Sequence, residues 1–309
     1  MTRITLGLAM IVKDEAANLH ACLGPLMPVL DAVSIVDTGS TDGTVEVLQR
    51  NFGISAGTCI LLESECFDKT VARNQALARL STDWIIVLDA DERVAADRLA
   101  AFRDSLGKAD ADACFCPWVT HRPAGPLHDY KLAVFRRGLQ ARGRVHENMQ
   151  TDLRARGWRA RWNADLVIDH HPDPSRMRSK RAWYGRRLDC ALEREPGWIR
   201  YHWFKGYIAW RDGHIGVARE SLSAAAASRS SRFPVECLNA HMVLAELHAR
   251  AGDGEAAAAV VADARDFLGG VGDDWEVRIN FRLAPWLAAA AAAIAEGRLD
   301  AVRAYEFAC

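Results

Sequence analysis

The stretch Trp84-Ile85-Ile86-Val87-Leu88-Asp89-Ala90-Asp91 decides how the rest of the chain is interpreted. Its five apolar residues are typical of a strand that is buried on both faces of a sheet. Asp89 and Asp91 follow where the strand leaves the sheet, and ligands of α/β proteins bind at the carboxyl ends of such strands. Two carboxylates one residue apart can share a hard divalent cation and leave its other positions open for diphosphate oxygens. A solvated acidic turn is the alternative, because Glu92 comes next.

Strand and helix patterns alternate around this stretch. The expected strands are 4–12, 33–36 and 59–62, and the expected helices are 15–23, a segment through Val45, Val47 and Leu48, and 70–80. This rhythm predicts a largely parallel sheet with helices on both faces. An antiparallel or mixed extension of the sheet is predicted from shorter candidate strands at 113–119, 131–136 and 166–168. Ser40 or Thr41 is expected to cap the second helix.

Beyond about residue 179 the pattern is helical throughout. Three segments, 203–222, 244–264 and 291–307, each read as a helix, a small-residue turn and a second helix. Their turn glycines are Gly213, Gly252 and Gly297. Tetratricopeptide-type hairpins repeat about every 34 residues, so these are loose repeats, and an irregular helical bundle is the alternative. We therefore expect an α/β domain over 1–178 and a helical domain over 179–309.

Composition limits the classes of partner. The 309 residues carry 39 Lys and Arg against 40 Asp and Glu, so no strong overall field attracts nucleic acid or an anionic membrane. The eight cysteines are scattered without a CxxC pair, which is typical of reduced thiols. No export signal or span of about 20 apolar residues is evident. We expect a cytoplasmic protein without a transmembrane segment, and leave a homodimer open.

Further polar positions follow the predicted strands. Asp37 ends the second strand, where its carboxylate can accept hydrogen bonds from a base or ribose, although a plain strand–loop–helix connection is the alternative. Charge also arrives after Val12, where the first strand leaves the sheet, and solvated charges are the alternative. Arg73 suits a phosphate or a base carbonyl, or it is a surface arginine of a helix.

Two later stretches carry candidate acid–base or metal-binding groups. His146 and Glu147 stand side by side after a basic loop, and either can accept a proton from an attacking group. His170 and His171 follow a candidate strand, and a neutral imidazole can complete the coordination of a carboxylate-bound metal. Solvated loop residues are the alternative for both.

Five stretches in this order resemble the family-2 glycosyltransferases of GT-A fold: MIVKDEAANL at 10–19, VDTGSTDGT at 36–44, ARN at 72–74, LDADE at 88–92 and GRVHE at 143–147. The resemblance covers roughly residues 4–175. It implies a GT-A mixed-sheet domain that uses a nucleotide diphosphate sugar, commonly a UDP-sugar, with Mg²⁺ or Mn²⁺, and that inverts the anomeric centre.

The resemblance also implies roles for single residues. The positions implied to bind the nucleotide sugar are Val12, Lys13, Glu15, Asp37, Arg73, Asp89 and Ala90. Asp91 is implied to bind the metal directly, Asp89 to contact ribose or metal-bound water, and His170 to help bind metal and diphosphate. Glu147 is our choice of general base, and His146 is the alternative.

A GT-A domain followed by helical repeats resembles a branch with tetratricopeptide-like tails. This branch includes peptide S-glycosyltransferases of the sublancin type, and related sequences act on surface glycans. The resemblance therefore implies a peptide side chain or a surface-glycan precursor as acceptor. Two readings compete: a catalytically inactive helical-repeat adaptor that binds a peptide partner, and a nucleotidyltransferase. The latter needs a glycine-rich basic loop after the first strand, where this chain has MIVKDEAANL.

Overall fold

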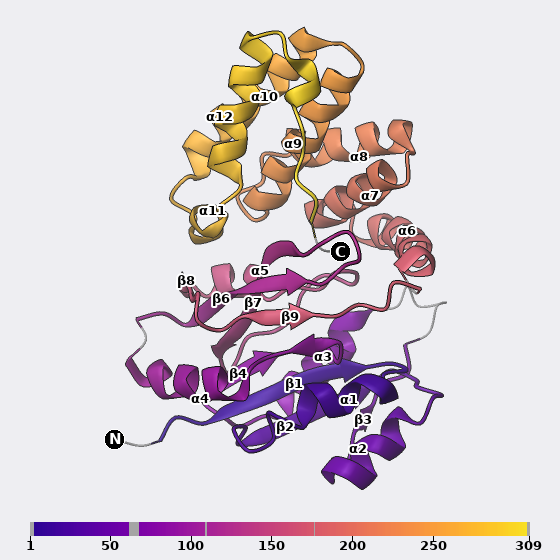
Figure 1. Cartoon of the computed structure of the whole chain (residues 1–309), viewed down its shortest axis with the longest axis vertical. Coiled ribbons are helices and arrows are strands. Elements are labelled where there is room, and N and C mark those ends of the chain that lie inside the picture. Colours follow the sequence, from indigo (N-terminus) through magenta and orange to yellow (C-terminus); the bar gives the residue numbers. More distant parts are fainter. Residues whose placement is uncertain (1–2, 62–67, 109, 176, 308–309) are drawn as a thin grey trace. The chain divides into compact units, whose positions relative to one another are not determined.

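The computed structural model describes residues 3–61, 68–108, 110–175 and 177–307. The chain forms two compact units, one that extends to Met177 and one from Arg178 to Phe307. The first unit contains the sheet and the second is helical (Figure 1).

The described part of the first unit holds one mixed sheet. Its strands are β1 Leu6–Val12, β2 Ala32–Asp37, β3 Gly57–Thr58, β4 Trp84–Val87, β5 Glu92–Arg93, β6 Ala113–Thr120, β7 Leu127–Arg136, β8 Ala160–Trp162 and β9 Ile168–His170. The order is β3-β2-β1-β4-β7-β6-β9-β5, with β8 beside β6. Strands β3, β2, β1 and β4 run parallel, and β7 pairs antiparallel with both β4 and β6. The predicted parallel sheet with a mixed extension is confirmed.

Helices cover both faces of this sheet. They are α1 Ala16–Leu23, α2 Thr44–Phe52, α3 Lys69–Ala78, α4 Ala96–Ser105 and α5 Gln150–Ala155. On β1, Leu6, Leu8 and Met10 pack into one core with apolar residues of α1, α2 and α4. Helix α3 lies against β1 and β2 and contributes no residue to that core, which places it on the opposite face. Alternation of side chains along β1 therefore gives each helical layer its own face.

Two local expectations were wrong. Strand β3 is Gly57–Thr58 rather than 59–62, of which residue 62 lies outside the described part. Helix α2 is capped neither by Ser40 nor by Thr41, since its N-cap is Gly43 with φ 91°. Asp42 instead accepts from the backbone N–H groups of Thr44 and of Ala16, 3.0 Å each. One carboxylate thus serves the first turns of two helices.

The second unit is a series of antiparallel helices. They are α6 Met177–Arg194, α7 Ile199–Arg211, α8 Ile215–Ala227, α9 Pro234–Arg250, α10 Gly254–Val271, α11 Trp275–Ile279 and α12 Leu283–Ala295. The first two expected hairpins are present as α7/α8 and α9/α10, with Gly213 and Gly252 in the left-handed conformation at their turns. Gly206 lets α7 approach α8, because a Cβ there would lie 2.6 Å from Leu222 Cγ.

The third expected hairpin is wrong. After α12 the chain makes only a three-residue 3₁₀ turn, Leu299–Ala301, and then continues without a helix. This last segment returns over the unit, where the Ala304 N–H donates to Glu246 Oε2 (2.6 Å) and Tyr207 Oη donates to the Phe307 carbonyl (3.0 Å). This segment, held by the buried Glu246 and by Tyr207, is found where the second helix of the third hairpin was expected.

The cysteines depart in one place from the expectation of reduced thiols. Free thiols are found at Cys22, Cys59, Cys114, Cys116 and Cys237. Cys190 is disulfide-bonded, whereas Cys66 and Cys309 lie outside the described residues. Within the described residues, no helix has the length and apolar character needed to cross a membrane.

Candidate active site

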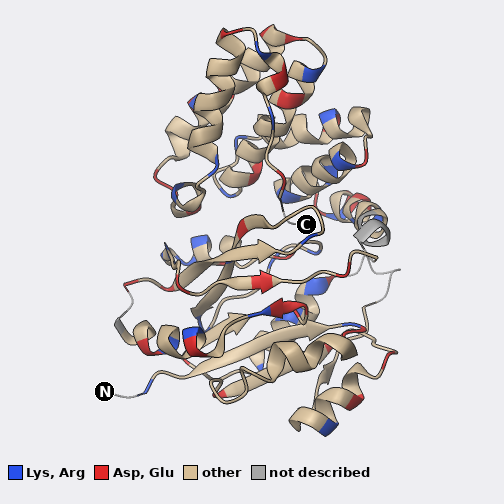
Figure 2. Ribbon diagram, in the orientation of Figure 1, with Lys and Arg blue, Asp and Glu red and all other residues tan. Residues whose placement is uncertain are grey.

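Strand pairing gathers distant parts of the sequence at one edge of the sheet. The register of β1 with β2 places Val12 opposite Asp37, so these strand ends are level. Strand β9 pairs with both β5 and β6, and this brings His170 opposite Glu92 and Thr120. Figure 2 shows acidic and basic positions close together on this part of the sheet. The result is a polar cluster built from the ends of separate strands, where ligands of open α/β sheets bind.

The loops after β1 and β2 are hydrogen-bonded into one structure. The Asp14 N–H donates to Ser40 Oγ (2.9 Å), and the Thr41 N–H donates to Asp14 Oδ1 (2.7 Å). The Glu15 N–H donates to Thr44 Oγ1 (2.8 Å). Two of the stretches that carry the resemblance therefore support each other directly.

The residues expected to hold a nucleoside lie on these two loops. The buried Asp37 carboxylate accepts from the N–H groups of Gly39 (2.9 Å) and Ser40 (3.1 Å). The Val12 carbonyl accepts from the Thr38 N–H (2.9 Å), and Lys13 is exposed. Asp37 and Val12 thus shape the loop themselves, and their contacts with a nucleoside stay a prediction.

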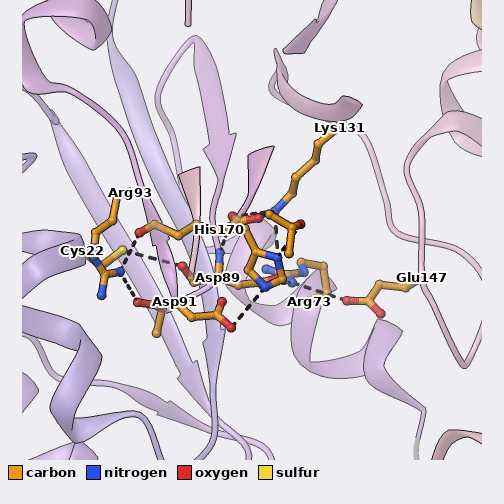
Figure 3. A network of polar contacts seen from close by, with 11 residues as sticks. Cys22, Arg73, Asp89, Asp91, Arg93, Lys131, Glu147 and His170 are labelled. Carbon is orange, nitrogen blue, oxygen red and sulfur yellow. Dashed lines mark hydrogen bonds and ion pairs between the residues drawn. The ribbon is translucent and has the colours of Figure 1, made fainter. Parts of the chain in front are cut away.

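Asp89 lies between two cations (Figure 3). Arg73 Nη2 donates to Asp89 Oδ1 at 3.1 Å, and Lys131 Nζ lies 3.9 Å from Oδ2. Burial among protein atoms raises the pKa of Asp89, but Lys131 and Arg73 outweigh it and hold that pKa well below its usual range. The Asp89 side chain is 48% exposed, so this ionised carboxylate still faces outward.

Glu92 and Lys131 form a buried ion pair that the sequence interpretation missed. Glu92 is fully buried, and Lys131 Nζ donates to its two oxygens at 2.8 and 2.7 Å. Glu92 Oε2 also accepts from the Asp89 N–H (2.9 Å). Burial raises the pKa of Glu92 and the Lys131 ammonium opposes it. The alternative of a solvated acidic turn is therefore wrong, and a lysine next to the apolar run LAVF was the overlooked signal.

Arg73 connects Asp89 to Glu147. Its Nη2 lies 3.4 Å from Glu147 Oε1, and the guanidinium is 6% exposed. The neighbouring Asn74 holds the loop before Glu147 in place, since it accepts from the Ala141 N–H (2.7 Å) and donates to the Ala141 carbonyl (3.1 Å). The ARN stretch therefore fixes both the arginine and the loop that carries Glu147, while His146 has φ 53°.

Asp91 and His170 form a second pair of candidate metal ligands. His170 Nε2 lies 3.3 Å from Asp91 Oδ2, and His170 Nδ1 lies 3.0 Å from Thr120 Oγ1. The His170 ring stacks on Trp118 with 4.9 Å between centroids. Adjacent ligands of an octahedral Mg²⁺ at about 2.1 Å are about 3 Å apart, so the two atoms fit neighbouring positions on one cation. A Thr120 partner on Nδ1 would leave Nε2 to the metal.

This pair is smaller than the expected set of three ligands. Over the described ranges, no cluster of three or more His, Cys, Asp or Glu side chains could hold a metal ion. Asp89 instead pairs with Arg73 and Lys131. Any metal held here would therefore take its remaining ligands from elsewhere, such as water or a bound diphosphate.

Arg93 holds the turn that contains these carboxylates. Its Nη1 donates to the carbonyls of Ala90 (2.7 Å) and Glu92 (2.8 Å), and Nη2 donates to Asn18 Oδ1 (3.3 Å). Asn18 Nδ2 in turn donates to Glu15 Oε2 (2.7 Å). The loop after β1 and the turn after β4 are therefore connected through Arg93 and Asn18, which the sequence interpretation did not single out, and through Glu15, which it did.

The chain is similar to known proteins along part of its length. Residues 8–158 match the family model "Glycosyl transferase family 2". A TPR repeat-containing protein of Synechococcus elongatus is 30% identical over 226 residues, 71% of this chain and 54% of that protein. The SPbeta prophage-derived glycosyltransferase SunS of Bacillus subtilis is 24% identical over 148 residues, 46% of this chain and 34% of that protein. The chain thus spans about half of the first relative's length and about a third of the second's.

Solved structures give a weaker likeness. S. aureus TarS 1–349 in complex with UDP-GlcNAc has a TM-score of 0.49 at 12% identity, over 97% of this chain and 90% of that one. Glucosyl-3-phosphoglycerate synthase from Mycobacterium tuberculosis, in complex with Mn²⁺ and UDP-glucose, has a TM-score of 0.41 at 16% identity, over 55% and 72%.

Proposed function

The first unit of this chain belongs to glycosyl transferase family 2 and has the GT-A fold, and from that premise we propose that the chain is a metal-dependent, inverting glycosyltransferase that uses a nucleotide diphosphate sugar, with a UDP-hexose as the expected donor. The observation that carries the proposal is Arg73, which contacts both the ionised Asp89 and Glu147. This links a carboxylate on the expected donor side to the candidate base through one buried cation.

The donor would lie across the loops after β1, β2 and β4. Val12, Lys13, Glu15 and Asp37 would surround the nucleoside, and Asp89, beside Ala90, would accept from its ribose. Asp91 and His170 would bind Mg²⁺ or Mn²⁺, with Asp89 nearby. When bound, this ion neutralises the charge that builds on the departing diphosphate. Lys131 and Arg73 are the neighbouring protein cations.

The proposed reaction is a single displacement at the anomeric carbon of the donor. The acceptor's nucleophilic group attacks the anomeric carbon on the face opposite the diphosphate. The bond between that carbon and the diphosphate oxygen breaks, and its electron pair leaves with the nucleotide diphosphate. Glu147 takes the acceptor proton, and Arg73 orients the carboxylate for this step. His146 is the alternative base.

We propose the helical unit, taken as residues 179–309, as the site of acceptor recognition. The support is that helical repeats present extended surfaces for peptides. The relative SunS is named a glycosyltransferase, and the Synechococcus relative is named for TPR repeats. A peptide side chain or a surface-glycan precursor is the expected acceptor, and the atom that attacks is left open.

Release of nucleotide diphosphate tests the proposal. The purified chain is incubated with UDP-glucose, UDP-galactose, UDP-GlcNAc or GDP-mannose and Mn²⁺, and free UDP or GDP is followed by chromatography. We expect slow release from at least one UDP-sugar even without acceptor, and loss of that release with EDTA. Folded protein that releases neither nucleotide, with or without peptide and glycan acceptors, would argue for the inactive adaptor.

A further inference from the structure

The buried pair of Lys131 and Glu92 forms a triangle with Asp89. The Glu92 carboxylate accepts from Lys131 Nζ at 2.8 and 2.7 Å and from the Asp89 N–H at 2.9 Å. Lys131 Nζ then lies 3.9 Å from Asp89 Oδ2. A fully buried carboxylate needs such partners, because an unpaired charge is costly in a protein interior. Glu92 thus holds the Asp89 main chain in place, and Lys131, the cation paired with Glu92, faces the Asp89 side chain.

The position of the ammonium sets this pair apart from one that only fills the core. Asp89 is the half-exposed carboxylate of the candidate site, and Arg73 occupies its other oxygen at 3.1 Å. Lys131 Nζ also lies 5.9 Å from the centre of the Trp118 ring, the same ring that stacks on His170. The pair therefore adjoins both the carboxylate and the histidine of the candidate donor site.

We propose that Lys131, anchored by Glu92, is a positioning residue for the nucleotide sugar: its ammonium holds the Asp89 carboxylate in a fixed orientation as an acceptor for hydroxyl groups of the donor. This inference rests on the proposed function. An acceptor that is already oriented between two cations needs little reorganisation when a ligand arrives, and preorganisation of this kind strengthens binding. Glu92 acts one step further away, through Lys131 and the Asp89 main chain.

The test separates positioning from stability with two variants. Lys131→Met leaves Glu92 buried without its cation, so its melting temperature should fall. The double variant Lys131→Met/Glu92→Gln removes both charges and keeps an amide oxygen for the Asp89 N–H, so most of that loss should return. The dissociation constant for UDP with Mn²⁺ is measured by calorimetry. We expect it to rise about tenfold or more in both variants, as for the loss of a charge-assisted contact.

Lys205→Met is the matched control, because Lys205 also pairs with a carboxylate (Asp189, 2.6 Å) but lies on α7 in the helical unit. It should bind UDP like the wild type. If the double variant recovers both melting temperature and UDP affinity, or if neither variant weakens UDP binding, Lys131 is only structural and the inference is overturned. A folded wild type that binds no UDP with Mn²⁺ would instead reject the proposed function, and this inference with it.

Discussion

Replacing Asp91 by Asn removes the carboxylate from the pair that Asp91 forms with His170. Asp91 Oδ2 lies 3.3 Å from His170 Nε2, and the Asp91 carbonyl accepts from the His171 N–H (2.8 Å). The substitution keeps that backbone contact and the side-chain shape, and it removes a negative ligand. A catalytic divalent ion stabilises transition-state charge by several kcal/mol. A loss of about 3–4 kcal/mol corresponds to a fall in kcat/KM of about 10²–10³-fold.

Stability should change little, because Asn keeps the shape of the Asp91 side chain and leaves its backbone contact with His171 in place. The assay is release of UDP from the donor at saturating Mn²⁺, with the melting temperature measured beside it. Asp97→Asn is the matched control, since Asp97 is an exposed carboxylate in the first turn of α4. Full turnover by the Asp91→Asn protein at saturating metal would refute the reasoning, and so would an equal loss in the Asp97→Asn protein.

Three further predictions concern the base, the loop that carries it and the helical unit. Glu147→Gln should lower kcat for transfer by about 10²–10⁴-fold while UDP affinity stays within a few-fold of the wild type. If His146→Gln shows this loss of kcat and Glu147→Gln does not, the base is His146. Burial raises the pKa of Asp152, but hydrogen bonds from Arg156, the Gln140 N–H and Arg142 outweigh it and lower that pKa. The Asp152 carboxylate therefore stabilises the fold above the unfolded pKa of about 3.9, and this stabilisation is lost as the pH falls through the lowered folded-state pKa. The difference in melting temperature between wild type and Asp152→Asn should therefore shrink from pH 7 to pH 3, and a constant difference would contradict it. A chain shortened to end before α7 should bind UDP, measured by calorimetry, but fail to transfer sugar to its natural acceptor. Transfer retained by the shortened chain would contradict this prediction.

Periodicity alone predicted much of the first unit. The apolar runs at β1 and β4 are continuous because these strands are covered on both faces, and that makes them visible in the sequence. The hydrogen-bonding choices of loop side chains were less visible. Ser40 looked like a helix cap, but its hydroxyl donates to Asp37 and accepts from the Asp14 N–H. Asp42 instead accepts from the first turns of both α1 and α2. Several polar residues in one short loop compete for the same role, and only the three-dimensional arrangement decides between them.

The candidate site was predictable where a residue type implies chemistry and less so where it implies support. Asp89, Asp91 and Arg73 stood out because paired carboxylates and an arginine suggest cations and phosphates. Glu92 entered only through the alternative of a solvated acidic turn, because its partner Lys131 is 39 positions away and their pairing depends on the sheet. The missing third hairpin has a similar cause, since the segment after Ala301 is held by contacts with Glu246 and Tyr207 that no local pattern reveals.

Thermal unfolding of the full chain in a matrix of UDP or GDP against Mn²⁺, Mg²⁺ or EDTA tests the central claim most directly. A ligand at about 100 times its dissociation constant stabilises a fold by about 2.7 kcal/mol, which raises the melting temperature by several degrees. The account predicts a rise that requires both UDP and a divalent ion and that disappears in the Asp91→Asn protein. A melting temperature that no nucleotide changes, with or without metal, would contradict a nucleotide-sugar site and favour the inactive adaptor.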